Sequence, residues 1–472
     1  MKRHDAVVIG AGPNGLAAAI VLAQAGLSTA IHEATESIGG GCRTAEVTLP
    51  GFRHDVCSAI HPLAVASPFF SSLPLEQYGL HWIQPPIALA HPFDDGSAAL
   101  LVHSIDETAQ SLGEDRASYQ RLMRPLVEDY ELLVPQLLGP VRLPRHPFAL
   151  ATFGMLALRS AQGIANARFQ GVHARGLFAG LAAHSFLRLD QRATSAFALM
   201  LGLLAHAVGW PIARGGSQSI VEALASHLRS LGGEIELRSP ISSLEAFDPD
   251  QLVLLNLTPR QVTAVSSDRL PMRYRRRLGR YRYGPGVFKI DWALDGPVPW
   301  TSDTCHDAGT VHLGGTIEEI AAAEREVSLG RHPDRPLVLV GQQSRFDPTR
   351  APAENATLWG YCHVPNGSRE DMTNRIERQI ERFAPGFRER ILARSAMGPA
   401  DLELYNANCV GGDINGGLQD LRQMFTRPVP RLNPYSTPDP NIFVCSSSTP
   451  PGGGVHGMAG YFAARAALKK CT

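Results

Sequence analysis

The most constraining feature of this sequence is a short apolar run that leads directly into a glycine-rich turn. Ala6 to Ile9 is followed by Gly10, Gly12 and Gly15, in the spacing G-x-G-x-x-G. The apolar run predicts a strand buried on both faces. In this spacing the first glycine allows a tight turn, the second lets the backbone approach a pyrophosphate, and the third lets a helix pack closely on the strand. The turn therefore predicts the phosphate end of a dinucleotide site.

The residues after the turn supply the rest of a dinucleotide-binding unit. Leu16 to Ala25 is rich in alanine and leucine and predicts a helix, and Leu27 to His32 predicts the next strand. Glu33 follows that strand, where an acid accepts hydrogen bonds from an adenosine ribose. The start of the helix, with Pro13 and Asn14, offers free N–H groups and a positive dipole end to a diphosphate.

A second glycine cluster indicates which dinucleotide is bound. Gly39, Gly40 and Gly41 precede Arg43 and Thr44, which gives E-x5-GG-x2-RT after the ribose acid. This pattern resembles the two-domain FAD flavoproteins that include phytoene desaturases, monoamine oxidases and Rab GDP-dissociation inhibitors. The resemblance implies that FAD is the cofactor and that this loop lies beside its diphosphate and isoalloxazine.

The end of the chain carries a second signal for the same family. Asn441 to Cys445 predicts a strand, and Gly453, Gly454, Val455 and His456 belong to a stretch that resembles T-H-P-G-x-G-x-P of phytoene desaturases. In that family the following helix N-terminus meets the flavin pyrimidine, where its dipole stabilises the charge of reduced flavin. His456 replaces the usual proline and would donate to the flavin, titrate near it or cap the helix.

Two further segments refine the resemblance. Trp210 to Leu224 resembles the W/Y-P-x-GG-x3-L segment with which the family returns to the cofactor domain. Amine oxidases usually carry Gly-Asp before the closing helix, whereas this chain has Ser446 and Ser447 there. The closest group is therefore expected to be the phytoene-dehydrogenase-related oxidoreductases.

Composition excludes several other classes. The chain has 472 residues with 44 Lys+Arg and 44 Asp+Glu, so nothing global indicates nucleic-acid binding. The seven cysteines are scattered and form no C-x-x-C, which favours reduced thiols in a cytoplasmic protein over zinc or disulfides. No metal site is expected. The apolar run after Met1 to Arg3 is the first strand, so we do not expect a signal peptide.

The segment 148–207 is unusually apolar and helix-forming. Ala193 to Ala213 contains no Asp, Glu, Lys or Arg and is long enough to cross a bilayer, but Trp210-Pro211 interrupts it. Three alternatives are open: a transmembrane helix, a buried helix that lines an apolar substrate cavity, and a surface that rests on a membrane. We favour the buried helix, because neighbouring segments share the apolar character that a tunnel for an apolar substrate needs.

These signals predict an α/β fold with a discontinuous, Rossmann-like FAD-binding domain and a mixed α+β substrate domain. The FAD-binding domain is expected at 1–75, 208–265 and 430–472, and the substrate domain at 76–207 and 266–429. The substrate domain should combine apolar helices with one antiparallel sheet that faces the flavin. Its strands are expected at Gly286 to Leu294, His312 to Thr316, Pro336 to Gln343 and Ala356 to Pro365.

The leading hypothesis is an FAD-dependent dehydrogenase or desaturase. It would move hydride from a C–C or C–N bond of an apolar substrate, such as an isoprenoid or lipid, to flavin N5. His61, Asp413 and His456 are the candidate bases. No second G-x-G-x-x-G provides for a nicotinamide cofactor, so oxygen or a quinone is the expected electron acceptor. Peripheral membrane contact and a homo-oligomer are compatible with this hypothesis.

The alternatives belong to other classes. An amine or amino-acid oxidase would release peroxide, and a flavin-dependent isomerase would leave the substrate's redox state unchanged. A non-catalytic lipid or prenyl carrier, like the Rab GDP-dissociation inhibitors, is disfavoured because those proteins have a degraded FAD pocket. In this chain Gly10, Gly12, Gly15, Glu33 and Arg43 all stand.

Overall fold

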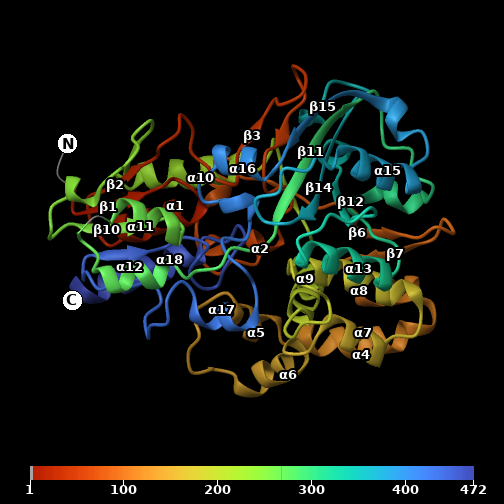
Figure 1. Ribbon diagram of the computed structural model, residues 1–472, viewed down its shortest axis with the longest axis horizontal. Coiled ribbons are helices and arrows are strands. Elements are labelled where there is room, and N and C mark those ends of the chain that lie inside the picture. The colour runs from red at the N-terminus through yellow and green to blue at the C-terminus, as the bar shows by residue number, and fades with distance from the viewer. Residues whose placement is uncertain (1–3, 267, 472) are drawn as a thin grey trace.

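Two sheets of different size organise the chain, the smaller at the left of Figure 1 and the larger at the right. The computed structural model describes residues 4–266 and 268–471, so residues 1–3, 267 and 472 of the expected FAD-binding and substrate domains lie outside the described part. The sheets and the helices that cover them confirm the α/β class. The residue boundaries between the two domains stay a prediction.

The smaller sheet has five parallel strands drawn from separate stretches of the chain. In order across the sheet they are β16 (Ile442–Val444), β10 (Leu252–Leu255), β1 (Ala6–Ile9), β2 (Thr29–His32) and β9 (Glu234–Glu236). The central strand β1 is buried throughout, because Val8 packs into a core on one face and Val7 into a core on the other. The strands predicted around the glycine-rich turn and near the end of the chain are confirmed.

Helices cover both faces of this sheet. One face packs on α1 (Pro13–Gln24), α10 (Gln218–Ser230) and α18 (Met458–Cys471), and the other on α11 (Pro259–Val265) and α12 (Met272–Leu278). Helix α18 crosses the start of α1 in backbone contact, since a Cβ on Gly460 would lie 1.8 Å from the carbonyl oxygen of Asn14. The closing helix is thereby held against the glycine-rich turn.

The larger sheet has seven strands. In order across the sheet they are β15 (Ile391–Met397), β11 (Gly286–Leu294), β14 (Ala356–Val364), β13 (Val338–Gly341), β12 (Ala308–Leu313), β6 (Ile87–Pro92) and β7 (Ala98–Leu101). The sheet is mixed rather than antiparallel as predicted, because β6 enters from a distant part of the chain and pairs with β12 in parallel. All other neighbouring pairs in this sheet are antiparallel.

One predicted strand is placed differently. The strand expected at His312 to Thr316 runs from Ala308 to Leu313 and ends before the two glycines. Thr316 instead caps helix α13 (Ile317–Ser328), and its side chain accepts a hydrogen bond from the Glu319 N–H at 3.4 Å. The Thr-x-x-Glu spacing is a capping box, which competes with continuation of the strand.

The two faces of the larger sheet have different roles. On β11, Ile290 and Trp292 pack into a core beneath α15 (Thr373–Phe383), whereas Val287 and Lys289 point to the opposite face. This alternation follows from the two-residue period of a strand. The opposite face lines a cavity, as predicted for the floor of the substrate domain.

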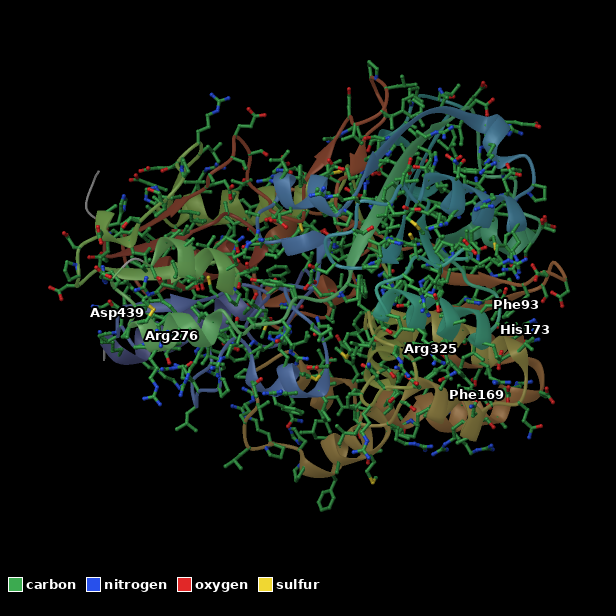
Figure 2. The ribbon with its side chains drawn as sticks, in the orientation of Figure 1. Phe93, Phe169, His173, Arg276, Arg325 and Asp439 are labelled. Carbon is green, nitrogen blue, oxygen red and sulfur yellow. The ribbon has the colours of Figure 1, made fainter. Side chains whose placement is uncertain are left out.

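A layer of helices lies over that opposite face, below the larger sheet in Figure 1 and reaching toward the centre, and Figure 2 shows its side chains in the same orientation. Its members are α3 (Ile105–Ser111), α4 (Arg116–Glu128), α5 (Tyr130–Leu137), α6 (Pro147–Ala157), α7 (Ala161–Arg168), α8 (Val172–Ala183) and α9 (Ser195–Ala207). No single helix among residues 4–266 and 268–471 is long and apolar enough to cross a membrane; α6 and α7 pass that test only together, across a 93° bend. The run 193–213 forms α9 and then the short strand β8 (Ile212–Ala213), so the predicted bilayer-length segment is broken.

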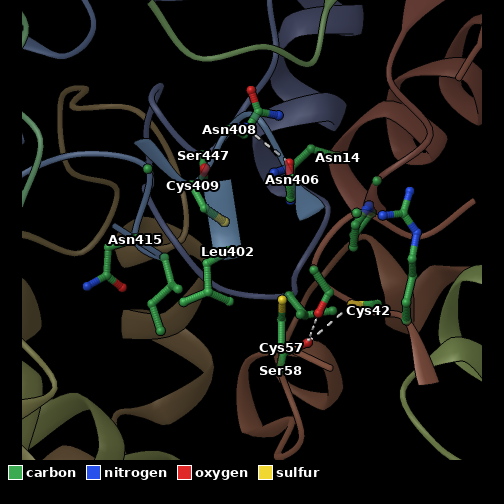
Figure 3. Close-up of a pocket in the computed structure, with 18 of the residues that line it drawn as sticks. Asn14, Cys42, Cys57, Ser58, Leu402, Asn406, Asn408, Cys409, Asn415 and Ser447 are labelled. Carbon is green, nitrogen blue, oxygen red and sulfur yellow. Dashed lines mark hydrogen bonds between the residues drawn. The ribbon is translucent and has the colours of Figure 1, made fainter. Parts of the chain in front are cut away.

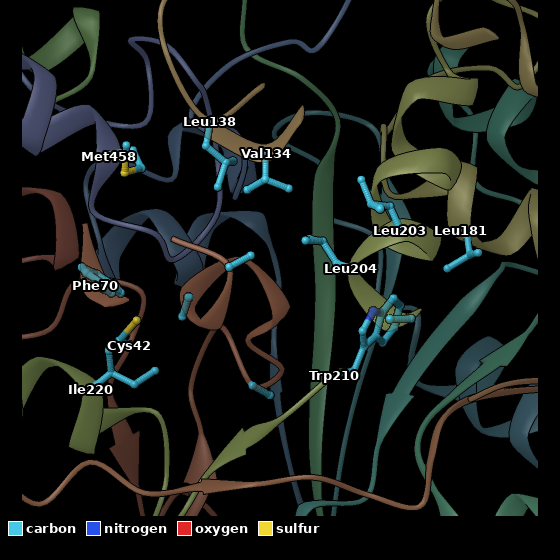
Figure 4. Close-up of a cluster of buried hydrophobic side chains, with 14 of the residues drawn as sticks. Cys42, Phe70, Val134, Leu138, Leu181, Leu203, Leu204, Trp210, Ile220 and Met458 are labelled. Atoms are coloured by element: carbon cyan, nitrogen blue, oxygen red, sulfur yellow. The ribbon is translucent and has the colours of Figure 1, made fainter. Parts of the chain in front are cut away.

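A continuous apolar core joins the helical layer to the smaller sheet. Leu203 and Leu204 of α9 belong to the same cluster as Ile220 of α10 and Met458 of α18 (Figure 4). The favoured alternative for the apolar segment, a buried helix beside a cavity, agrees with this burial.

The remaining short elements are β3 (Thr44–Ala45), β4 (His54–Asp55), β5 (Trp82–Ile83), α2 (Pro62–Val65), α14 (Gln343–Phe346), α16 (Pro399–Tyr405), α17 (Leu421–Thr426), η1 (Phe70–Ser72), η2 (Leu75–Tyr78), η3 (Gly113–Asp115), η4 (Leu244–Ala246), η5 (Asp303–Asp307), η6 (Pro348–Arg350), η7 (Phe387–Arg390) and η8 (Val410–Gly412).

Candidate functional site

A cavity of about 700 Å³ connects the two sheets. Its lining runs from Gly10 and Glu33 at the smaller sheet to Trp359 and Leu201 at the larger sheet and the helical layer. Figure 3 shows part of this lining, where Asn14 and Cys57 face the loop that carries Asn406, Asn408 and Cys409. The volume lies within the range of small-molecule and cofactor sites, about 300–1,000 Å³.

The glycine-rich turn forms one end of the cavity. Gly10 has a φ of +98°, and a Cβ on Gly15 would lie 1.9 Å from the carbonyl oxygen of Gly10. Gly15 therefore lies behind the turn and lets α1 pack against it, whereas Gly10, Gly12, Pro13 and Asn14 line the cavity. No side chain caps α1, so its first N–H groups stay open toward the cavity.

The predicted ribose acid, Glu33, lies at the same end. It lines the cavity, and its Oε2 accepts a hydrogen bond from the Ala11 N–H at 2.8 Å. Its Oε1 accepts from the N–H of Thr35 at 3.1 Å and from the Thr35 hydroxyl at 2.9 Å. Glu33 thus ties the turn to the end of β2, and Oε2 retains acceptor capacity for a ligand hydroxyl.

The second glycine cluster lies against the glycine-rich turn. Gly40 and Gly41 line the cavity, as does Arg43. The Arg43 Nη2 donates to the Thr35 hydroxyl at 2.5 Å, and the guanidinium lies 5.3 Å from the centre of the Tyr405 ring. Thr44 is absent from the lining among the described residues, because its hydroxyl donates to the Asp55 carboxylate instead.

Only some of the residues predicted before the closing helix line the cavity. Gly454 and Val455 line the cavity, but Gly453 packs against residue 415, where a Cβ would lie 2.9 Å from the backbone oxygen. His456 is buried, and its Nδ1 accepts a hydrogen bond from the Met458 N–H at 3.0 Å. Burial lowers the pKa of His456 to about 4. Three roles were considered for His456, and this hydrogen bond corresponds to helix capping.

The structure brings two of the three candidate bases to the cavity. His61 lines it, and its Nε2 lies 2.8 Å from the Ser217 hydroxyl; burial lowers the pKa of His61 to about 4. Asp413 also lines the cavity and accepts hydrogen bonds from the N–H groups of Gly284 at 2.7 Å and Asn415 at 2.8 Å. Burial raises the pKa of Asp413. His456 does not belong to the lining among the described residues.

Sequence reasoning missed a buried lysine at the cavity wall. Lys289 of β11 lines the cavity, forms an ion pair with Asp291, and lies 6.0 Å from the centre of the Trp359 ring. Burial raises the pKa of Asp291 to about 6, and the Asp291 carboxylate also lies 3.6 Å from His54. The signal that could have identified Lys289 is its position between apolar residues in a strand whose side chains alternate regularly between the two faces.

Aromatic side chains form the wall beside Lys289. Trp359 and Tyr361 of β14 meet at 77° with ring centres 5.2 Å apart, and Phe186 stacks on Tyr361 at 6.4 Å. His184 and Trp210 complete this wall. Among residues 4–266 and 268–471, no group of three or more His, Cys, Asp or Glu residues could hold a metal ion.

The sequence is similar to known oxidoreductases, to some over a part of the chain and to others over nearly all of it. A model of the family described as NAD(P)-binding Rossmann-like domain matches residues 8–72. The chain is 26% identical to pyridine nucleotide-disulfide oxidoreductase domain-containing protein 2 from Rattus norvegicus, over 98% of this chain and 92% of that protein. A limonene dehydrogenase polypeptide from Castellaniella defragrans is 29% identical, over 30% of this chain and 25% of that protein.

Solved structures share the whole architecture. An oxidoreductase from Methanosarcina mazei has a TM-score of 0.66 at 15% identity, with 98% of this chain and 99% of that chain covered. Putrescine oxidase bound to putrescine has a TM-score of 0.63 at 17% identity, with 99% of each chain covered. This protein therefore has the Rossmann-like α/β fold of the FAD-type oxidoreductases, which confirms the predicted fold class. It is related in sequence to the pyridine nucleotide-disulfide oxidoreductase proteins and in fold to the amine oxidases.

Proposed function

We propose that this protein is an FAD-dependent dehydrogenase that removes hydrogen from a C–C or C–N single bond of a largely apolar substrate. The observation that carries the proposal is one continuous cavity with two chemically different ends. One end is the glycine-rich turn at Gly10 and Gly12, and the other is an apolar wall that includes Leu201, Leu339 and Trp359. A dinucleotide at the first end would bring its redox-active ring toward the second.

The residues at the turn fit FAD. Gly12 gives α1 an N-terminus without a side chain, and an added Cβ there would lie 3.1 Å from the Asn256 amide nitrogen. A diphosphate would meet open N–H groups and the positive end of the α1 dipole. Glu33 would accept from a ribose hydroxyl, and Arg43 would supply a fixed positive charge at the same end.

Bound FAD would accept hydride from a substrate carbon, which is chemistry that the cofactor itself supplies. The apolar wall would exclude water from the reacting atoms and orient the substrate. Lys289 would hold a positive charge at the wall, where Asp291 fixes its position and where negative charge that develops nearby would be stabilised. Asp413, with its raised pKa, is a stronger base than an exposed carboxylate and stays a candidate proton acceptor together with His61.

The limonene dehydrogenase relative supports an apolar hydrocarbon or isoprenoid as substrate, because it is named for one. We place this protein with the phytoene-dehydrogenase-like enzymes on the residues around Arg43 and Gly454. The expected electron acceptor is a quinone or oxygen.

The test is anaerobic reduction of the FAD-loaded protein by a panel of apolar substrates, followed by timed reoxidation. Reduction followed by slow reoxidation in air and fast reoxidation by a soluble quinone supports the dehydrogenase. If alanine substitution of His61, Asp413 and His456, one at a time, leaves the rate of flavin reduction unchanged, none of the three is the base.

An amine oxidase is the second candidate. The aromatic wall of Phe186, Trp359 and Tyr361 favours it, because such a wall could enclose an amine, and putrescine oxidase shares the fold. Release of stoichiometric peroxide on addition of an amine such as cyclohexylamine, without reduction by apolar substrates, would establish this alternative. An isomerase or a lipid carrier is supported by no particular contact of the described residues.

We also propose that the α6 surface rests on an anionic lipid surface. Phe148 and Met155 of α6 are 87% and 70% exposed, and Leu143 just before the helix is 92% exposed. Arg142 and Arg145 lie beside these residues in the chain. Exposed apolar side chains next to cations are the pattern of an interfacial helix.

A further inference from the structure

Three histidines extend from the aromatic wall of the cavity into the protein. His184 lines the cavity, and its Nε2 lies 3.2 Å from the Nε2 of His312. His91, on the next strand, gives its Nε2–H to the carbonyl oxygen of Gly315 at 2.7 Å. None of these contacts belongs to the dinucleotide end or to the Lys289 pair.

The fold explains why these imidazoles meet. Strands β6 and β12 run parallel with Leu89 opposite Thr310, so His91 and His312 are neighbours on one face of the sheet. Helix α8 covers this face and presents Gly180 to both rings, because an added Cβ would lie 2.8 Å from the His312 Nδ1 and 3.2 Å from the His91 Nδ1. His184 follows the last turn of α8, which brings its ring over His312 with a distance of 5.1 Å between ring centres.

The hydrogen bonds determine where the protons are. A carbonyl oxygen only accepts, so His91 carries its proton on Nε2 and has a bare Nδ1. Between His184 and His312 one Nε2 donates and the other accepts. If His184 donated, the proton of His312 would be on its Nδ1, which is buried and has no partner in the described chain. A buried N–H without an acceptor is rarer than an acceptor without a donor. We therefore assign His312 the tautomer that carries its proton on Nε2, so that His312 donates and His184 accepts.

The consequence is at the cavity surface. Because the Nε2 of His184 accepts from His312, the neutral ring carries its proton on Nδ1. That Nδ1 makes no hydrogen bond with residues 4–266 or 268–471 and, unlike the Nδ1 atoms of His312 and His91, is not among the fully buried nitrogens. A fixed N–H donor therefore lies in the cavity wall beside Phe186 and Trp210.

We propose that His184 is a specificity-determining residue, and that the substrate carries a neutral oxygen acceptor, a carbonyl or ether oxygen, that receives its Nδ1–H. The proposal rests on the proposed function for the identity of the cavity as the substrate site. His312 acts as a positioning residue, since its Nε2–H holds the His184 tautomer and it lies outside the cavity lining of the described residues.

Electrostatics support a neutral donor. Burial lowers the pKa of His184 to about 3, with the charge of His363 as a further cause, and burial lowers the pKa of His91 to about 4. Burial also lowers the pKa of His312 well below its usual value, with the neighbouring imidazoles as further causes. All three rings are neutral at pH 7, so the line provides a hydrogen bond without a positive charge.

A pair of isosteric probes tests the selectivity. 4-Phenylcyclohexanone and 1-methylene-4-phenylcyclohexane differ in one oxygen acceptor, and their affinities are measured by isothermal titration calorimetry. We expect the ketone to bind at least tenfold more tightly than the alkene, since the alkene leaves the N–H unpaired. The preference should fall to about onefold in His184→Phe and should weaken in His312→Phe. It should persist in the matched control His227→Phe, which removes a buried histidine outside the cavity. Equal affinities in the unmodified protein, or a preference that survives in His184→Phe, would overturn the proposal.

A second readout does not depend on any ligand. Nitrogen chemical shifts of histidine-labelled protein distinguish the two neutral tautomers, and His184→Phe and His312→Phe assign the signals. We expect His184 protonated on Nδ1 and His312 on Nε2, and the opposite pair would contradict the proposal. If the protein bound no FAD but showed these tautomers and the ketone preference, the proposed redox function would fail while the donor site stood. FAD binding without ketone preference would have the reverse meaning.

Discussion

Replacement of Arg350 by methionine should destabilise this protein strongly at neutral pH. The Arg350 Nη2 donates to the Asp55 carboxylate at 2.8 Å, and both side chains are 1% exposed. Arg350 lies in η6, after the larger sheet's β13, whereas Asp55 lies in β4, beside the second glycine cluster. The pair therefore links the segment after β13 to the strand that follows the second glycine cluster. Loss of one partner of a buried ion pair leaves the other charge uncompensated and costs about 3–5 kcal/mol.

The cost should depend on pH in a defined direction. Burial raises the pKa of Asp55, but the charge of Arg350 and hydrogen bonds from Ser217 and Thr44 outweigh it, so the pKa lies below its ordinary value. A carboxylate with a depressed pKa contributes stability above the unfolded-state pKa, near 4, and loses it as pH falls through the folded-state value. In Arg350→Met the largest opposing cause is gone and the pKa of Asp55 should rise. The difference from the unmodified protein should then shrink as pH falls toward 4, because the carboxyl becomes neutral.

The assay is denaturant unfolding followed by circular dichroism at pH 7 and pH 5. The matched control is Arg345→Met, because the Arg345–Asp307 pair is 3.5 Å apart with side chains 53% and 57% exposed. That control should cost less than about 1 kcal/mol. An Arg350→Met protein within about 1 kcal/mol of the unmodified protein at pH 7, or a loss that grows at pH 5, would refute the reasoning.

Three other predictions follow from the same contacts. Gly12→Val places a side chain at the open N-terminus of α1 and should weaken FAD binding at least tenfold, whereas Gly154→Ala, which would meet nothing within 4 Å, should not; equal FAD titrations of both variants would contradict this. Stability should fall as pH drops from 6.5 to 4, because His54, His61, His91, His184, His206 and His456 have pKa values lowered to about 3–4 by burial. For a histidine with a lowered pKa the unfolded state binds the proton first, at about 1.4 kcal/mol per pH unit per group, so an unfolding midpoint that is equal at pH 7 and pH 5 would be incompatible with their burial. Phe148→Ser/Met155→Ser should reduce co-sedimentation with phosphatidylglycerol vesicles severalfold relative to Leu329→Ser, a control with a half-exposed leucine just after α13; identical sedimentation would exclude α6 as the contact.

Much of the glycine-rich end of the cavity could be predicted from the sequence, because its signals are local. The strand at Ala6–Ile9, the turn and α1 follow one another within a few residues, and backbone geometry alone determines where each glycine is needed. Glu33 and Arg43 line the cavity for the same reason, since each closely follows a predicted element.

The end of the cavity at the larger sheet depends on contacts between distant residues, which no local pattern contains. The parallel pairing of β6 with β12 joins segments more than 200 residues apart, and the meeting of His91 with His312 is its consequence. Periodicity also treats a charged residue as exposed, which is why Lys289 was missed; its burial depends on Asp291 and on Trp359 from another strand. His456 was considered as a donor to the flavin, a group that titrates near it or a helix cap, and its Nδ1 accepts from the Met458 N–H at the start of α18.

The cavity is proposed to hold FAD at the glycine-rich turn. The most direct measurement is the visible spectrum of the protein after incubation with FAD and removal of unbound cofactor, with Gly12→Val treated in parallel. We expect flavin absorbance at about one FAD per chain in the unmodified protein and little in the variant. A colourless protein, or equal flavin retention by both proteins, would contradict it.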